Sequence, residues 1–577
     1  MKKKLLPALI VTGLIILVVI IMGITALINK YTPTKKTEDL KEYFNISSDD
    51  EAALIVDNEL SDYKAKIIDK KIYVDYKFVH DSLNSRFYWD ANENVLLYTT
   101  ASDIISAAAD SNSYSVTKQT NDFGYPIVKA TSDSALIALD YVKQYSNITV
   151  KSYDDPARIV ITSKWDEIDS ATVSNSTQIR VKGGIKSPIL KEVKKDDKIT
   201  ILDSGDKWDK VATEDGVIGY IKRKALSESK KTKLTNPDYE EETFTHIKKD
   251  KDICLAWNQV TSQSANSKVP QVISSTKGIN VMSPTWFYLN DNNGNLADIA
   301  SKDYVSYCHS QGIEVWGLFS NLENTDVDAA YVLTHTSTRT TLINQIMSAA
   351  FNYELDGVNI DFENITEAAY GDSYIEFIRE LSIKCHNNGI SLSVDVTVPA
   401  SFNKFFNRSD MANFADYIVI MGYDEHYKGS DAGSVSSIPW VTEGVESTLK
   451  EVPADQIILG MPFYTRIWEL TPKEDDDAVT DTEDQSKYTV ASQVYSMDAA
   501  AAQLATNNAT AALDEKSGQN YAEWSASNKL YKVWLEDSTS LEKRLKLVDD
   551  NKLAGAAFWK LGFENSSVWD TVIKYLD

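Results

Sequence analysis

The apolar residues form one long run at the start of the chain and many short runs later. Residues 5–28 contain no charged side chain and follow three lysines. A helix of that length would be about 36 Å long, which exceeds the ~30 Å hydrocarbon core of a bilayer. The run is longer than the apolar part of a signal peptide, and no small-residue cleavage site follows it. We therefore expect residues 1–30 to form an uncleaved transmembrane anchor.

Lysines flank this run on both sides, so charge counting alone does not orient it. A short tail inside and a large extracytoplasmic part is the commoner arrangement. We expect a single-pass protein of the cell membrane, held through residues 5–28, with its catalytic domain outside the cytoplasm.

Short runs recur at regular intervals from residue 246 to residue 577. Several are almost continuously apolar, which is typical of parallel strands covered on both faces. The length suits a (β/α)8 TIM barrel. The predicted strands are Ile253–Asn258, Gly278–Pro284, Ile313–Ser320, Leu355–Glu363, Ser391–Val398, Tyr417–Tyr423, Ile457–Phe463 and Gly555–Leu561. The long interval at about 465–550 predicts an α+β insertion beside the barrel mouth.

Residues 37–165 contain an internal repeat. Val79 corresponds to Val142 at an offset of 63 residues, and Asp90 corresponds to Asp154 at an offset of 64. Each copy predicts a strand, a short helix and a hairpin. This duplicated α+β domain resembles the N-terminal domain of copper amine oxidases, although His80 is its only histidine. We interpret it as a spacer or wall-interaction module without copper.

Residues 171–226 change to short Val-rich strands with Gly and Asp turns, and 227–245 read as a polar linker. The strand pattern resembles a small bacterial SH3-type barrel. In exported proteins such a module binds cell-wall peptide, and a passive spacer is the equal alternative.

Composition limits the possible functions. The chain has 577 residues and a formal net charge of −25, which excludes a nucleic-acid partner because such proteins need a basic face. Its cysteines, Cys254, Cys308 and Cys385, are too few and too widely spaced for a disulfide framework or a metal site.

The stretch LDGVNIDFEN at 355–364 carries the candidate chemistry. Asn359, Asp361 and Glu363 are spaced by two, with apolar residues between them. Side chains alternate along a strand, so the three polar groups should face the barrel interior, with Glu363 at the carboxyl end where barrel active sites lie. Two acids about 7 Å apart along a strand separate their pKa values. We expect Glu363 to hold its proton and Asp361 to be its ionised partner. The alternative is a polar strand end that is solvated at the barrel rim and has no catalytic role.

These residues resemble the Asp-x-x-Asp-x-Asp-x-Glu signature of glycoside hydrolase family 18, the chitinase family. Met421–Asp424 is similar to the family's Met-x-Tyr-Asp, and Trp559 to the tryptophan that floors its central sugar subsite. The resemblance implies that Glu363 is the acid/base, that Asp361 and Tyr423 are catalytic through the substrate's acetamido group, and that Asp424 binds sugar hydroxyls. It implies no metal and no organic cofactor.

The chain departs from ordinary chitinases at two places. The third strand lacks Ser-x-Gly-Gly, and Asn359 stands where chitinases have Asp. Both features resemble the branch of spore-cortex-lytic N-acetylglucosaminidases, which act on bacterial cell wall. With a neutral amide at 359, we expect Asp361 to titrate with Glu363 alone and Asn359→Asp to shift the pH–rate profile.

Other polar and aromatic residues are candidates for binding sugar. Asn359 belongs to the inward row, while Trp257, Trp286 and Trp316 lie at or near strand ends and could stack on sugar faces or only pack. His426 follows the Tyr-Asp pair as a subsite contact or a plain loop residue.

Three functions remain open. The first is a membrane-anchored glycosidase that cleaves β-1,4 bonds after N-acetylglucosamine in peptidoglycan with retention. The second is a non-catalytic glycan-binding barrel, and the third is a chitinase acting on external chitin.

Overall fold

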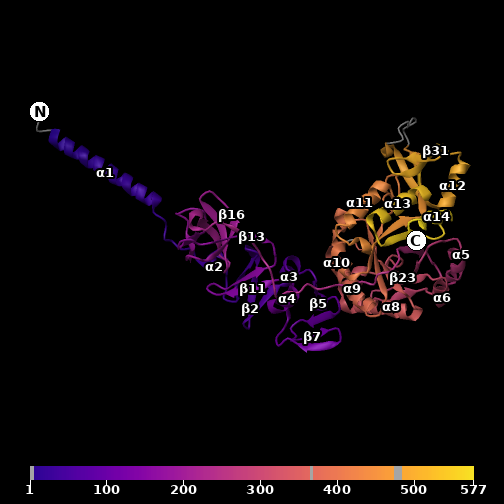
Figure 1. Ribbon diagram of the computed structural model, residues 1–577, viewed down its shortest axis with the longest axis horizontal. Coiled ribbons are helices and arrows are strands. Elements are labelled where there is room, and N and C mark those ends of the chain that lie inside the picture. The colour runs from indigo at the N-terminus through magenta and orange to yellow at the C-terminus, as the bar shows by residue number, and fades with distance from the viewer. Residues whose placement is uncertain (1–4, 364, 366–367, 474–483, 577) are drawn as a thin grey trace. The chain divides into compact units, whose positions relative to one another are not determined.

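The computed structural model describes residues 5–363, 365, 368–473 and 484–576 (Figure 1). It divides into two compact units. Unit 1 comprises Met1–Trp89, Ala107–Tyr114 and Asp122–Glu241; unit 2 comprises Asp90–Ser106, Ser115–Asn121 and Glu242–Asp577. The predicted 37–165 domain is thus divided between the units.

Unit 1 begins with helix α1, Leu5–Tyr31, whose segment Pro7–Tyr31 is long and apolar enough to cross a membrane and is not covered by the rest of the structure. The short helix α2, Leu40–Tyr43, follows it.

Two seven-stranded sheets form most of the rest of unit 1. The first has the order β11-β12-β1-β2-β3-β10-β9 and is formed by β1 Glu51–Val56, β2 Glu59–Ile68, β3 Lys71–Asp75, β9 Val128–Ala130, β10 Ala135–Ala138, β11 Thr149–Tyr153 and β12 Arg158–Thr162. The second has the order β15-β14-β18-β17-β16-β13-β19 and is formed by β13 Glu167–Thr172, β14 Thr177–Arg180, β15 Ile189–Val193, β16 Lys198–Asp203, β17 Trp208–Thr213, β18 Ile218–Lys222 and β19 Lys230–Lys233.

Two details bear on the predicted modules. The helices α3, Tyr76–Ser82, and α4, Leu139–Tyr145, are both seven residues long and each follows a strand and precedes two more. Strand β19 lies inside the predicted linker, because its backbone pairs with β13 and Lys231 forms an ion pair with Asp169.

The (β/α)8 barrel predicted for the C-terminal part is confirmed. Its parallel strands lie in the order β20-β33-β27-β26-β25-β24-β23-β21, and β21 pairs with β20 to close the ring. The strands are β20 Ile253–Asn258, β21 Val281–Leu289, β23 Glu314–Ser320, β24 Gly357–Asp361, β25 Ser391–Thr397, β26 Tyr417–Met421, β27 Ile457–Pro462 and β33 Gly555–Trp559; a short β22, Leu296–Asp298, pairs with β21.

Helices surround these strands (Figure 1). They are α5 Val269–Ile273, α6 Lys302–Ser310, α7 Ala329–Thr334, α8 Thr336–Tyr353, α9 Ala368–His386, α10 Arg408–Phe414, α11 Ile438–Thr448, α13 Ser538–Asn551 and α14 Val568–Val572. The outward-facing side chains of the strands bury themselves under the helices, and this burial is the main favourable term for the fold.

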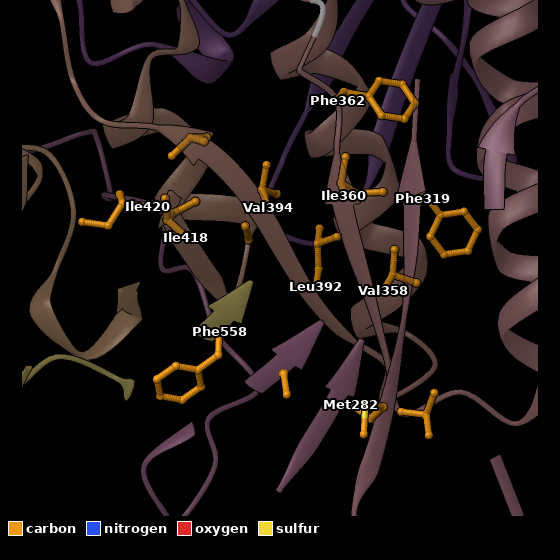
Figure 2. Close-up of a cluster of buried hydrophobic side chains, with 14 of the residues drawn as sticks. Met282, Phe319, Val358, Ile360, Phe362, Leu392, Val394, Ile418, Ile420 and Phe558 are labelled. Carbon is orange, nitrogen blue, oxygen red and sulfur yellow. The ribbon is translucent and has the colours of Figure 1, made fainter. Parts of the chain in front are cut away.

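Strand β24 shows why the sequence pattern works. Val358, Ile360 and Phe362 are buried in the layer between strands and helices, next to Leu392 and Val394 of β25 (Figure 2). The ring of Phe362 stacks on Phe377 of α9 at 5.6 Å. Their outward positions force the residues between them into the barrel interior.

The predicted insertion is also present. A five-stranded sheet of order β29-β28-β32-β31-β30 and the helix α12, Met497–Thr506, lie between β27 and α13. Its strands are β28 Tyr464–Pro472, β29 Tyr488–Ser496, β30 Ala512–Asp514, β31 Gln519–Ala526 and β32 Lys529–Leu535.

A further five-stranded sheet has the order β4-β5-β6-β7-β8, with β4 Phe87–Asp90, β5 Val95–Thr99, β6 Ile104–Ala108, β7 Ser113–Val116 and β8 Gln119–Asp122. Residues 90–106 belong to unit 2 and contact the barrel helices. The carboxylate of Asp90 accepts hydrogen bonds from the backbone N (2.7 Å) and Oγ1 (2.6 Å) of Thr336, at the start of α8. Glu93 accepts from Ser337, and Thr99 donates to Glu376 of α9 at 2.8 Å.

Candidate active site

The row of polar residues at 359, 361 and 363 lies where the pattern places it, with one difference. Strand β24 ends at Asp361, so Glu363 lies two residues beyond the strand. Its backbone N donates to Oδ1 of Asn321 at 3.1 Å, which ties this segment to the end of β23. Glu363 is exposed, whereas Asn359 is fully buried. The row therefore runs from the barrel core to solvent at the mouth.

Asn359 is bonded on every side by protein. Its Oδ1 accepts from Trp257 Nε1 and Ser283 Oγ, both at 3.0 Å, and its Nδ2 donates to Ser393 Oγ at 3.0 Å and Asp395 Oδ1 at 2.7 Å. An indole N–H only donates, so it fixes the amide oxygen toward Trp257 and the amide NH2 toward Asp395. The prediction that Asn359 binds substrate is wrong, because no bonding position of its amide is left and none of its surface is exposed.

Asp395 is a residue of the site that the sequence pattern did not single out. It lies on β25, is 3% exposed, and is bonded by the amide of Asn359. Burial first, then the negative charges of Asp395 and Glu363, raise the pKa of Asp361 well above its ordinary value. The expectation that Asp361 titrates with Glu363 alone is therefore wrong. A neutral amide at 359 does not leave Asp361 without a second acidic neighbour.

The pKa of Glu363 is also raised. Desolvation by the surrounding protein is the main cause, followed by the charges of Asp424 and Glu323. Although the side chain reaches solvent, its surroundings disfavour the ionised form. A carboxyl group with a raised pKa is suited to serve as a general acid.

Tyr423 and Asp424 follow β26 at the same end of the barrel. Tyr423 is half-buried, with its ring 6.4 Å from that of Trp257, and burial followed by the charges of Asp361 and Asp395 raises its pKa well above the ordinary value. Its hydroxyl therefore remains a hydrogen-bond donor at working pH. Asp424 is exposed, and its carboxylate accepts a hydrogen bond from the hydroxyl of Tyr464 in the insertion.

The tryptophans divide into three kinds. Trp559, at the end of β33, is half-buried and open to the mouth, with its ring 5.9 Å from that of Trp257. Trp257 points inward but is 1% exposed, because Trp559, Tyr423 and Asn359 cover it. The prediction that Trp257 binds sugar directly is wrong; it supports the residues above it.

Trp286 lies on the opposite face of its strand. It is fully buried in the helix layer, where its ring packs on Tyr304 at 4.8 Å and its Nε1 donates to Asn266 at 2.8 Å. The prediction of a sugar contact is wrong, since a strand's outward face does not reach the mouth. Trp316 is likewise fully buried and donates to Glu314 at 3.0 Å.

The sequence carried a readable signal for Asp395. It alternates with apolar residues along β25, the same period of two that singled out Asn359 and Asp361. Asn321 and Glu323 lie in a loop, where no periodicity marks them. His426 is half-buried and lies 3.0 Å from the carbonyl of Asp431 in its own loop.

Within the described residues, no group of three or more His, Cys, Asp or Glu side chains is arranged to hold a metal ion. The chemistry that the arrangement offers is that of acids and hydrogen-bond donors. An acid with a raised pKa at the mouth, a half-buried carboxyl group behind it and a tyrosine hydroxyl beside it, all at the carboxyl ends of barrel strands, are typical of an acid-catalysing β/α-barrel enzyme.

Comparison with known proteins identifies the class further. Residues 319–564 match the model of glycosyl hydrolases family 18. This part of the chain is similar to a family 18 domain, and the protein is a glycoside hydrolase.

Relatives and solved structures agree with that assignment. The chain is 24% identical over 301 residues to the uncharacterized glycosylase YvbX of Bacillus subtilis, covering 49% of this chain and 81% of that protein. It is 25% identical over 287 residues to the cortical fragment-lytic enzyme of the same organism, covering 48% of this chain and 63% of the relative, which is less than two thirds of its length. The Bacillus cereus spore cortex-lytic enzyme SleL, at 18% identity, has the same fold with a TM-score of 0.50 over 60% of this chain and 79% of that chain.

Proposed function

We propose that this protein hydrolyses β-1,4 bonds after N-acetylglucosamine in peptidoglycan, by substrate-assisted catalysis with retention. One observation carries the proposal: Glu363, with a raised pKa, reaches solvent at the barrel mouth in front of the half-buried carboxyl group of Asp361. That arrangement supplies an acid and a second carboxyl group beside it, but it leaves the nucleophile to the substrate.

In the first step the carbonyl oxygen of the substrate's 2-acetamido group bonds to the anomeric carbon. The glycosidic C–O bond breaks, and the leaving oxygen takes the proton of Glu363. In the second step water attacks the anomeric carbon, Glu363 takes its proton back, and the acetamido group is released. Two inversions at one carbon give net retention.

The other residues hold the acetamido group and the sugar. Asp361, when ionised, accepts the acetamido N–H and stabilises the positive charge that develops on the group. Tyr423 donates to the acetamido oxygen, Asp424 binds a sugar hydroxyl, and the ring of Trp559 forms the apolar floor under the sugar.

Peptidoglycan is preferred over chitin for two reasons. Several relatives are named for lysis of spore cortex fragments. The missing Ser-x-Gly-Gly on β23 and the amide at Asn359 also separate this chain from ordinary chitinases.

We also propose that α1 anchors the protein in the membrane and that the catalytic barrel lies outside the cytoplasm. Its apolar length supports an anchor. The β13–β18 barrel would then bind wall peptide as an SH3-type module. Carbonate extraction of membranes tests the anchor, since a released full-length protein would contradict it.

The activity is tested by comparing wild type with Glu363→Gln and with Glu446→Gln, a control at an exposed site on α11. On purified peptidoglycan we expect new reducing ends from wild type and the control. The Glu363→Gln protein should be slower by at least ~100-fold, because the leaving oxygen lacks its proton donor. Chitin oligomers assayed in parallel distinguish the two substrates. Glycan binding without release by any of the three proteins would exclude hydrolysis.

A further inference from the structure

Two carboxylates lie on neighbouring strands of the site, that of Asp361 half-buried and that of Asp395 buried. Strands β24 and β25 are parallel, with Asn359 beside Ser393 and Ile360 beside Val394. Continuing this register by one residue sets Asp361 beside Asp395, on neighbouring strands about 4.8 Å apart. Both side chains face the barrel interior, because the residues before and after each of them are buried in the helix layer. These are Ile360 and Phe362 for Asp361, and Val394 and Val396 for Asp395.

No cation neutralises this pair. Within the described part of the chain, neither Asp361 nor Asp395 forms an ion pair with Lys, Arg or His, and Oδ1 of Asp361 is buried without a hydrogen-bond partner. The other titratable groups that act on the pair are two acids, Glu363 and Glu323, and two tyrosine hydroxyls, those of Tyr374 on α9 and Tyr423 after β26. None of these groups carries positive charge. Two adjacent carboxylates that are shielded from water and lack a cation disfavour ionisation of both at once.

We propose that Asp395 is a positioning residue that shares one proton with Asp361, so that the pair carries a single negative charge. This inference deepens the proposed function and rests on it. When positive charge develops on the substrate's acetamido group, the proton moves from Asp361 to Asp395. Asp361 then bears the negative charge next to the substrate, and the total charge of the pair does not change.

Asn359 fixes the geometry of this exchange. Trp257 and Ser283 hold its oxygen, so its NH2 group is directed to Oδ1 of Asp395. A carboxylate at 359 would instead oppose that of Asp395. The amide and the acid thus fit each other, and the two residue types should be exchangeable as a pair.

The test compares full-length wild type with Asp395→Asn and with the swap Asn359→Asp/Asp395→Asn. Ser391→Ala is the control, because Ser391 is a buried residue of the same strand whose Oγ has no partner among the described residues. For Asp395→Asn we expect kcat on peptidoglycan to fall at least ~10-fold with KM within ~2-fold, since the loss is confined to charge placement in the transition state. The acidic limb of the pH–rate profile should move to lower pH, because removing a negative neighbour lowers the pKa of Asp361. The swap should recover most of kcat and return that limb, and Ser391→Ala should resemble wild type.

An unchanged kcat and profile in Asp395→Asn would overturn the proposal. Equal loss in the single variant and the swap, without movement of the acidic limb, would also overturn it and assign Asp395 a structural role.

A second readout does not depend on activity. In a Glu363→Gln background at neutral pH, infrared spectra should contain a protonated carboxyl band that is lost in both Asp361→Asn and Asp395→Asn. A band lost only in Asp361→Asn would place the proton on Asp361 through burial alone and contradict sharing. If wild type cleaves no glycan while the band behaves as expected, the proposed function fails and proton sharing stands.

Discussion

The barrel unit buries carboxylates in two different ways. In the helix layer they meet arginines: Glu536 and Arg544 both have fully buried side chains, with two N–H···O contacts of 2.6 and 2.9 Å, and Glu380 lies 2.8 Å from Arg339. In the barrel interior Asp361 is half-buried, and its Oδ1 has no hydrogen-bond partner among the described residues; Asp395 is buried and accepts from the amide of Asn359. The first arrangement is neutral as a whole, and the second is not.

The difference separates stability from chemistry. A buried, doubly bonded ion pair holds its elements in register. Two unpaired acids destabilise the core but leave one proton free to move. Folds retain such unfavourable groups where function needs them. Three substitutions test this contrast.

The largest effect on stability is expected from Arg544→Met. The substitution leaves Glu536 as an uncompensated buried charge, which should lower the free energy of unfolding of the barrel unit by roughly 3–5 kcal/mol. Urea unfolding measures the loss, and activity per folded molecule should be unchanged. Lys546→Met on the exposed face of α13 is the control, with a change within about 0.5 kcal/mol. A loss below 1 kcal/mol for Arg544→Met would show that the buried ion pair does not stabilise the barrel unit, and the contrast with the acids of the site would fail.

Asp361→Asn should act in the opposite sense. We expect kcat to fall roughly 100-fold, because the developing positive charge loses its partner, while the unfolding free energy at neutral pH stays equal or rises. The raised pKa of Asp361 means that the native state binds more protons than the unfolded state, so wild-type stability falls as pH rises from about 4 toward the native value. The variant's stability should depend less on pH, by up to ~1.4 kcal/mol per pH unit. The measurement is the free energy of unfolding at several pH values. Equal pH dependence in wild type and Asp361→Asn would refute this prediction.

Asn359→Asp should give the smallest effect. A new carboxylate facing Asp395 raises the pKa of Asp361 further, so the acidic limb of the pH–rate profile should move to higher pH and the rate at acidic pH should fall about 10-fold. Asn352→Asp, at an exposed site of α8, serves as the control. A profile identical to that of wild type would show that position 359 does not act on the charge of the pair.

The alternation along LDGVNIDFEN was enough to predict the barrel strand and the inward direction of Asn359 and Asp361. It did not predict that the strand ends at Asp361, since Phe362 continues the apolar pattern beyond the last strand residue. Asp395 follows the same alternation. That it lies beside Asp361 depends on the register between the neighbouring strands β24 and β25, which the alternation within one strand does not determine.

Trp286 illustrates a second limit. The predicted strand ends at Pro284, so the alternation within it assigns no direction to Trp286. The strand runs on to Leu289, and three residues from an inward serine is an outward position. A tryptophan near a strand end can therefore line a mouth or fill the helix layer, and only the strand's true extent distinguishes the two.

The hydrogen bonds from Thr336 and Ser337 to Asp90 and Glu93 have a consequence for modularity. Helix α8 takes the acceptors for its first amide groups from a hairpin some 240 residues earlier in the chain, because His335 at its N-cap offers no side-chain bond. A fragment that starts at residue 246 would leave those amides to water, at a cost of about 1 kcal/mol. The catalytic barrel and this hairpin therefore form one structural unit. A recombination event at residues 227–245 would separate them.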